Sequence, residues 1–312
     1  MARRCLQLAL ISLAWVSSAN AEAPPVPTFT VRANLVVVSA TAVDGHGRPI
    51  RDLRREEIRI FDEGRLQKIA HFTSAAESHA RILLLVDASG SMNSELKTAS
   101  TKMAMVQLLA ALDATDDVAL AGFDSRYFGL VPFTTDRRPI LGAFDDLTPF
   151  GSTALHDALD KAAQDLASHG EGRRAVVVIT DGVDTSSQKT PEEVIARSRA
   201  LDVPIYAISV LSPIDDPASP LYAGHGAAAT AAATAGSELL ARYARLSGGA
   251  AFVVSDFRGL RGASDQIVAE LKHQYRLGYD PPEGPPHFRR IEVKSTRRGV
   301  VVRTRSGYMP PS

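Results

Sequence analysis

The sequence predicts an α/β fold with a doubly wound, mainly parallel sheet, flanked in the chain by β-rich segments. In the middle of the chain, short apolar runs without polar alternation recur between segments of helical periodicity, a pattern typical of strands buried on both faces of a sheet. Toward both ends, β-rich runs are separated by turn sequences instead. Alternating strands and helices imply right-handed crossovers, and ligands of such sheets bind beyond the carboxyl ends of the strands.

The composition is that of an ordinary globular protein. The chain has 312 residues, of which 45% are hydrophobic and 22% are charged, enough for one large domain and a smaller one. Lys plus Arg and Asp plus Glu both total 35. Because there is no basic excess, we expect no nucleic-acid partner.

The first 21 residues have the three parts of a cleavable export signal. Arg3 and Arg4 precede an apolar run from Cys5 to Val16, and residues 19–21 form a small-residue cleavage site. The run is shorter than the roughly 20 residues that a membrane-spanning helix needs, so we expect cleavage after Ala21 and a periplasmic or secreted protein; an uncleaved anchor is the alternative. The only cysteine lies in this signal, which excludes disulfides from the mature chain. No later segment of the sequence is long and apolar enough to be predicted as a transmembrane helix.

Two β-rich tracts flank the central region. Residues 22–79 contain short runs broken by the turn sequences "DGHGRP" and "DEG", and residues 273–312 contain three more runs around "PPEGPP". A lone hairpin at either end would be marginally stable. We therefore hypothesise that the two tracts, far apart in sequence, form one small β-sandwich.

Residues 80–272 carry the alternating pattern. Thr190, followed by Pro191 and two glutamates, is a clear helix start. We expect the helix that begins near Ser94 to place five residues on one face: Leu96, Ala99, Met103, Val106 and Ala110. The predicted strands cover 81–87, 117–123, 174–180 and 203–211, and the predicted helices cover 94–113, 152–167, 190–201, 237–247 and 260–274.

One segment interrupts the alternation of strands and helices. Residues 212–236 are rich in Pro, Ala and Gly and are expected to form a mobile insertion before the next helix. Their alanines are also compatible with an extension of that helix. Both interpretations remain open from the sequence.

An acid and two hydroxyls follow the first buried strand. Asp87, Ser89 and Ser91 come after "ILLLV", and alternation along an extended stretch can point all three side chains one way. Taken singly, such residues would cap the following helix. Taken together, they offer the oxygen ligands that a hard divalent cation such as Mg²⁺ prefers, with neutral hydroxyls that leave its charge uncancelled.

The stretch "LLLVDASGSM" resembles the D-x-S-x-S signature of von Willebrand factor type A (VWA) domains, which have a Rossmann-like fold. The metal-ion-dependent adhesion site (MIDAS) of that family also uses a Thr and a second Asp from two later loops. Thr153 in "FGSTALHDAL" and Asp181 in "VVVITDGVD" match these positions in order and in rough separation. The flanking "GRPIRDL" and "YRLGY" resemble segments of the acidobacterial type of VWA-related proteins, a less specific match.

The resemblance implies a non-enzymatic protein in which Asp87, Ser89, Ser91, Thr153 and Asp181 bind a divalent metal ion. We expect Mg²⁺, with Mn²⁺ or Ca²⁺ as alternatives, and a protein or peptide ligand whose acidic side chain completes the coordination shell. The resemblance also implies that ligand binding couples to movement of the last helix of the domain, residues 260–272.

Other residues near the same sheet edge have simpler explanations. Asp184 and Asp124 are typical of turns, and His156 and Asp157 of the first turns of a helix. The main alternative function is a Mg²⁺-dependent phosphohydrolase in which Asp87 attacks phosphate. That chemistry usually needs a second carboxylate two residues later, where this chain has Ser89.

Overall fold

The computed structural model describes residues 35–74, 79–170, 172–211, 227–285 and 287–310, and these residues belong to one compact unit. The export signal predicted over residues 1–21 lies outside the described residues. Among the helices that are described, none combines the length and the apolar character that crossing a membrane requires.

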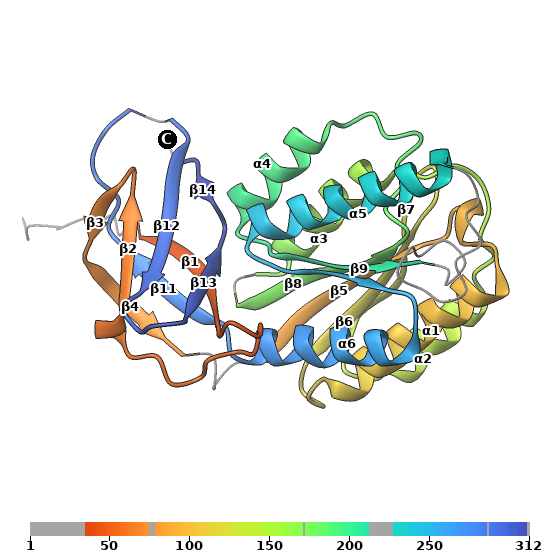
Figure 1. The fold of residues 1–312 in the computed structure, drawn as a ribbon, viewed down its shortest axis with the longest axis horizontal. Helices are drawn as coiled ribbons and strands as arrows, with labels where there is room; N and C mark the ends of the chain where they lie inside the picture. Colours follow the sequence, from red (N-terminus) through yellow and green to blue (C-terminus); the bar gives the residue numbers. More distant parts are fainter. Residues whose placement is uncertain (1–34, 75–78, 171, 212–226, 286, 311–312) are drawn as a thin grey trace, which may run out of the picture. The chain divides into compact units, whose positions relative to one another are not determined.

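A six-stranded sheet forms the centre of the α/β part (Figure 1). Its first five strands in spatial order are parallel, and only the edge strand β7 runs antiparallel to its neighbour β6. The predicted mainly parallel sheet is confirmed. In spatial order the strands are β10 (Ala251–Val254), β9 (Ile205–Val210), β8 (Arg173–Thr180), β5 (Ala80–Asp87), β6 (Asp117–Phe123) and β7 (Tyr127–Thr134).

Helices cover both faces of this sheet (Figure 1). Alternate residues of β5 explain why its apolar run is continuous: Leu84 packs with the helices on one face, and Leu83 and Leu85 pack with those on the other. One face carries α1 (Glu95–Ala111), α2 (Arg138–Asp145) and α6 (Phe257–Lys272), and the other carries α3 (Leu155–Ser168), α4 (Pro191–Leu201) and α5 (Ala227–Ser247).

Two helix starts follow the sequence prediction. Ser94 caps α1, its hydroxyl accepting a hydrogen bond from Lys97 N, and Thr190 forms a reciprocal capping box with Glu193 at the start of α4. Helix α5 begins at Ala227, so the alanines extend this helix, and the part of the proposed insertion that remains, residues 212–226, lies outside the described residues.

The five residues predicted to share one face of α1 are not the residues that this helix buries. Leu96 is 47% exposed, and Ala99 and Ala110 are exposed too. The helix has apolar residues on most of its sides, so periodicity alone does not select the face. The buried face contacts α6, where Ser264 Oγ donates a hydrogen bond to Ala104 O (3.4 Å). The buried residues of α1 are Thr101, Ala104, Met105, Leu108 and Leu109.

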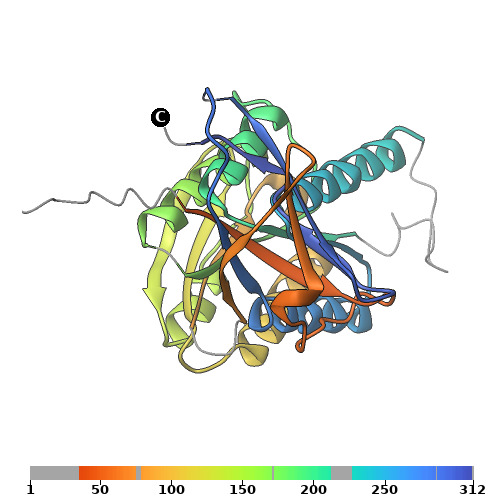
Figure 2. The same ribbon diagram turned by 90° about the vertical axis from the view of Figure 1, so that its left-hand side faces the viewer.

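Strands from the two β-rich tracts form two four-stranded sheets that share one apolar core (Figure 2). Strand β1 pairs antiparallel with β11, with Val38 opposite Leu277, and β2 pairs with β12, with Ile60 opposite Val293. The domain limits at residues 79/80 and 272/273 remain a prediction. One sheet contains β13 (Val301–Thr304), β1 (Val36–Val43), β11 (Tyr275–Tyr279) and β4 (Ile69–Thr73), and the other contains β14 (Gly307–Tyr308), β12 (Arg289–Ser295), β2 (Ile58–Asp62) and β3 (Arg65–Gln67).

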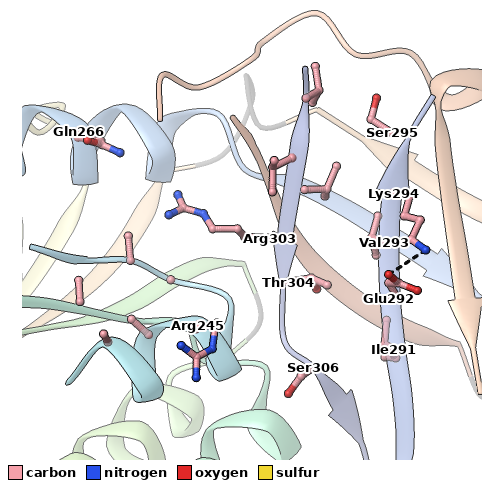
Figure 3. Close-up of a pocket in the computed structure, with 18 of the residues that line it drawn as sticks. Arg245, Gln266, Ile291, Glu292, Val293, Lys294, Ser295, Arg303, Thr304 and Ser306 are labelled. Atoms are coloured by element: carbon pink, nitrogen blue, oxygen red, sulfur yellow. Dashed lines mark ion pairs between the residues drawn. The ribbon is translucent and has the colours of Figure 1, made fainter. Parts of the chain in front are cut away.

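Buried charged groups join these sheets to the α/β part. The Arg305 guanidinium donates hydrogen bonds to Val37 O and Arg199 O, each at 2.6 Å. Arg303 forms an ion pair with Glu270 of α6, which is fully buried. Beside this pair lies a cleft of about 680 Å³ between the end of α5, β10 and the β12–β13 hairpin, and Figure 3 shows Arg303 extending from β13 toward α6.

Candidate metal centre

The predicted site residues lie beyond the carboxyl ends of two adjacent parallel strands. Asp87 is the last residue of β5, and Asp181 directly follows β8. Because Val86 is opposite Ile179 in this pair of strands, Asp87 lies beside Thr180. The Thr180 hydroxyl donates a hydrogen bond of 2.6 Å to Asp87 Oδ2, which joins the two strand ends.

The two serines lie on the short turn after Asp87. Asp87 Oδ1 accepts a hydrogen bond from Ser89 N (2.9 Å), and the Ser89 and Ser91 hydroxyl oxygens are 3.1 Å apart. Ser89 is fully buried, whereas Ser91 is exposed. The backbone at position 90 lies close to the backbone of the Thr153 loop, since a Cβ there would be 3.2 Å from Gly151 O. This close approach explains why the residue is a glycine.

The loop that carries Thr153 is bonded to both other loops. Phe150 N donates to Ala88 O (2.8 Å) and Gly90 N donates to Gly151 O (2.9 Å), so this loop pairs with the turn after β5. Thr153 O accepts a hydrogen bond from Thr185 N (2.8 Å) in the loop after β8. The structure therefore brings together the three loops that hold the five predicted residues.

The charges at this edge are poorly solvated. Asp87 is 4% exposed and Asp181 is 5% exposed. Burial raises the pKa of Asp87 to about 6, and the negative charge of Asp181 contributes to the rise, while the hydrogen bonds from Ser89 and Thr180 oppose it. Two buried carboxylates this close to each other favour a nearby cation.

The donor set fits a hard divalent ion. Two carboxylates and three hydroxyls are oxygen ligands, and such ions typically take one or two carboxylates with further neutral oxygens. Among the described residues, no group of three or more His, Cys, Asp or Glu side chains is arranged to hold a metal ion, so the hydroxyls are needed to complete this donor set. A cation is already accommodated at this edge, because Lys97 Nζ lies 2.9 Å from Asp181 Oδ2.

Neighbouring polar residues make structural hydrogen bonds, as expected. Asp184 accepts from Ser187 N (3.2 Å) and its hydroxyl (2.5 Å), and Asp124 accepts from Arg126 N (2.9 Å). His156 lies 2.9 Å from the Tyr243 hydroxyl, and burial lowers its pKa. The backbone N–H groups of Gln188 and Lys189 donate to Asp157 (3.0 and 2.9 Å).

The surroundings of Asp87 do not suit a phosphate nucleophile. Both of its carboxylate oxygens already accept hydrogen bonds, from Ser89 N and from the Thr180 hydroxyl, and its exposure is 4%. Each oxygen keeps a second lone pair that a small metal ion could use, but a nucleophile must also be reached by a bulky phosphate group, and Asp87 is almost fully buried. The geometry therefore favours ligand binding over nucleophilic attack at this residue.

Sequence reasoning missed two residues that contact the proposed ligands and one exposed residue on a neighbouring loop. Thr180 contacts Asp87, and Lys97 contacts Asp181. Phe150, which is 80% exposed, lies three positions before Thr153 on the same loop. The position of Thr180 directly before Asp181 at the strand end was an available signal. Nothing in the helix sequence singles out Lys97, because its contact depends on the angle at which α1 leaves the turn.

Comparisons with known proteins agree with this fold. Residues 82–183 match the family described as von Willebrand factor type A domain. A von Willebrand factor type A structure from Catenulispora acidiphila is similar with a TM-score of 0.50 and 13% identity, over 88% of this chain and 73% of that one. Proximal thread matrix protein 1 from the mussel byssus, with a zinc-occupied MIDAS motif, has a TM-score of 0.50 and 21% identity, over 69% of this chain and 50% of its own.

A curated relative extends the comparison only in part. An uncharacterized protein from Borreliella burgdorferi is 25% identical over 151 residues, which are 46% of this chain. The match spans 43% of that relative, so this chain corresponds to less than half of its length. The family match and the shared α/β fold nevertheless agree on the central region, and residues 82–183 of this chain match a von Willebrand factor type A domain.

Proposed function

We propose that this protein binds a protein or peptide ligand through a divalent metal ion held by Asp87, Ser89, Ser91, Thr153 and Asp181. The observation that carries the proposal is the pair of buried carboxylates at the ends of β5 and β8, with hydroxyls on loops bonded to them. The mussel byssus protein with a zinc-occupied MIDAS motif supports divalent binding in this fold. Mg²⁺ is the ion that we propose here, and Mn²⁺ or Ca²⁺ also suits these oxygens.

The ion would supply an electron-poor centre that attracts acidic groups. Only two of its five protein ligands carry a negative charge, so a bound divalent ion is not over-neutralised and retains an attraction for a carboxylate of a ligand. The protein's part is to hold the oxygens in place. The hydrogen bonds between the three loops provide this rigidity before any ion binds.

The surface beside the loops suits a protein ligand. Phe150 has an 80% exposed side chain, while its backbone N–H is bonded to Ala88 O next to Asp87. Exposed aromatic residues of this kind often anchor protein interfaces. We propose that the ligand places an acidic side chain on the ion and an apolar side chain against Phe150, without an enzymatic step.

We further propose that the protein works outside the cytoplasm. The support is the sequence of residues 1–21, whose charged start, apolar run and small-residue end are typical of a cleavable signal. The ligand would then be a component of the periplasm or of the extracellular space.

Ser91→Ala tests the proposed site with little risk to the fold. Ser91 is exposed, and its side chain contacts the Ser89 hydroxyl, so its removal should weaken Mg²⁺ binding measured by calorimetry at least about tenfold without altering the melting temperature. Ser100→Ala, the same change on the neighbouring helix, serves as the control and should bind Mg²⁺ normally.

The same two variants test the link to a ligand. In pull-downs from the native envelope, a partner retained with Mg²⁺ should be lost with chelator and with Ser91→Ala, and kept with Ser100→Ala. A partner that remains bound to Ser91→Ala in chelator would contradict metal-dependent binding.

A further inference from the structure

A lysine side chain lies at the proposed metal site. Lys97 is in the first turn of α1, where its backbone N–H donates to the Ser94 hydroxyl (3.2 Å). Its ammonium group turns back toward the strand ends, donating to Asp181 Oδ2 (2.9 Å) and to Ser91 O (3.1 Å). Lys97 thus contacts two of the five residues that we propose as metal ligands.

This contact is more protected than a surface ion pair. The side chains of Lys97 and Asp181 are 16% and 7% exposed. Ion pairs between exposed groups contribute little because water and salt screen them, whereas screening is weaker for a pair that is mostly buried. The Lys97 ammonium is therefore an effective counter-charge for Asp181.

A divalent ion would compete with this ammonium group. Both cations need the same carboxylate, and an ion beside Ser91 and Asp181 would be repelled by the lysine charge if the lysine stayed in place. The lysine can leave, because its flexible stem starts on the helix and its charge can reach water. Displacing it costs the free energy of its hydrogen bond to Ser91 O and of its charged hydrogen bond to Asp181.

We infer that Lys97 is a tethered competitor cation, which holds Asp181 in the metal-free protein and must be displaced before a divalent ion occupies the site. The inference rests on the proposed function, since it assumes that Asp181 belongs to a metal site. Lys97 then sets the ion concentration at which the protein becomes able to bind its ligand.

Lys97→Met tests the inference by removing the charge and keeping much of the apolar stem. Calorimetric titration should show Mg²⁺ binding about tenfold tighter than in the wild type, because the ion no longer displaces a bound cation. Lys102→Met is the matched control, since Lys102 lies on the same helix but pairs with Asp145 at an exposed position. Its Mg²⁺ affinity should equal that of the wild type.

The wild-type protein offers a second measurement that needs no variant. Acylation of lysine amines by an acetyl ester, followed by mass spectrometry, reports how free each ammonium group is. Lys97 should react slowly in chelator and severalfold faster with saturating Mg²⁺, while Lys102 should react at one rate in both conditions. This readout decides the question if Lys97→Met does not fold.

The outcomes separate the inference from the proposal beneath it. If neither the wild type nor Lys97→Met takes up Mg²⁺ at millimolar concentration, the proposed metal site is wrong, and the inference fails with it. If both proteins take up Mg²⁺ and Lys97→Met binds it equally or more weakly, the metal site stands and the inference about Lys97 is overturned.

Discussion

Asp87→Asn is expected to raise the melting temperature of the metal-free protein by about 5 °C at neutral pH and to abolish the further rise that Mg²⁺ gives the wild type. Burial raises the pKa of Asp87 from 3.8 to about 6, so keeping its ionised form in the folded state costs about 3 kcal/mol. Asparagine removes the charge but keeps its amide oxygen as an acceptor for Ser89 N, and its amide nitrogen can donate to the Thr180 hydroxyl oxygen.

The pH dependence of this difference has a definite sign. The folded protein binds the Asp87 proton more tightly than the unfolded chain does, so the cost is fully present above the folded pKa of about 6 and disappears as the pH falls toward 3.8. Melting curves in chelator from pH 7.5 to pH 4 should therefore converge for wild type and variant. Asp124→Asn, at the end of the neighbouring strand β6, should show no such effect, and an Asp87→Asn protein that melts below the wild type throughout would contradict the argument.

Arg303→Met should lower the free energy of unfolding by about 3 kcal/mol, the other large effect that the structure predicts. The variant leaves Glu270 fully buried without its cation, with a hydrogen bond from Gln266 Nε2 (3.1 Å) as partial compensation. Urea denaturation of the full chain measures the loss. Arg290→Met, an exposed position on β12, should be within about 0.5 kcal/mol of the wild type.

The double variant Glu270→Gln/Arg303→Met distinguishes charge from packing. If the unpaired charge causes the loss, neutralising Glu270 should restore most of the stability, because both partners of the buried pair are then gone. A double variant as unstable as Arg303→Met alone would assign the loss to packing in the cleft of Figure 3. The same ion pair attaches the second half of α6 to β13. The predicted ligand-linked movement of residues 260–272 would therefore have to break this ion pair or move β13 together with the helix.

Four strands of the central sheet and the starts of α1 and α4 could be predicted from the sequence because local chemistry determines them, whereas the edge strands β7 and β10 and the short helix α2 were not predicted. The run before Asp87 is continuously apolar since Leu83 and Leu84 enter different cores, and the cap at Thr190 uses only residues of its own first turn. The two acids Asp87 and Asp181 were recognisable for the same reason, as polar residues that end buried strands.

The features that could not be predicted depend on contacts between distant segments. The buried face of α1 is the one that packs in the core shared with α6, and the position of Lys97 follows from the direction of that helix. The association of the two β-rich tracts was hypothesised from the sequence, but the pairing of β1 with β11 was not, because alternation indicates strands and not their partners. Side chains whose role comes from such geometry carry no signal in a single sequence.

Diffraction from crystals soaked in MnCl₂ tests the central claim most directly, because the anomalous signal of manganese locates the ion without reference to the protein chain. The account predicts one strong peak beyond the ends of β5 and β8, within about 2.5 Å of the Ser89 and Ser91 hydroxyl oxygens, with Lys97 moved away from Asp181. Well-ordered loops with no peak there at millimolar Mn²⁺, or a peak only at another part of the surface, would contradict it.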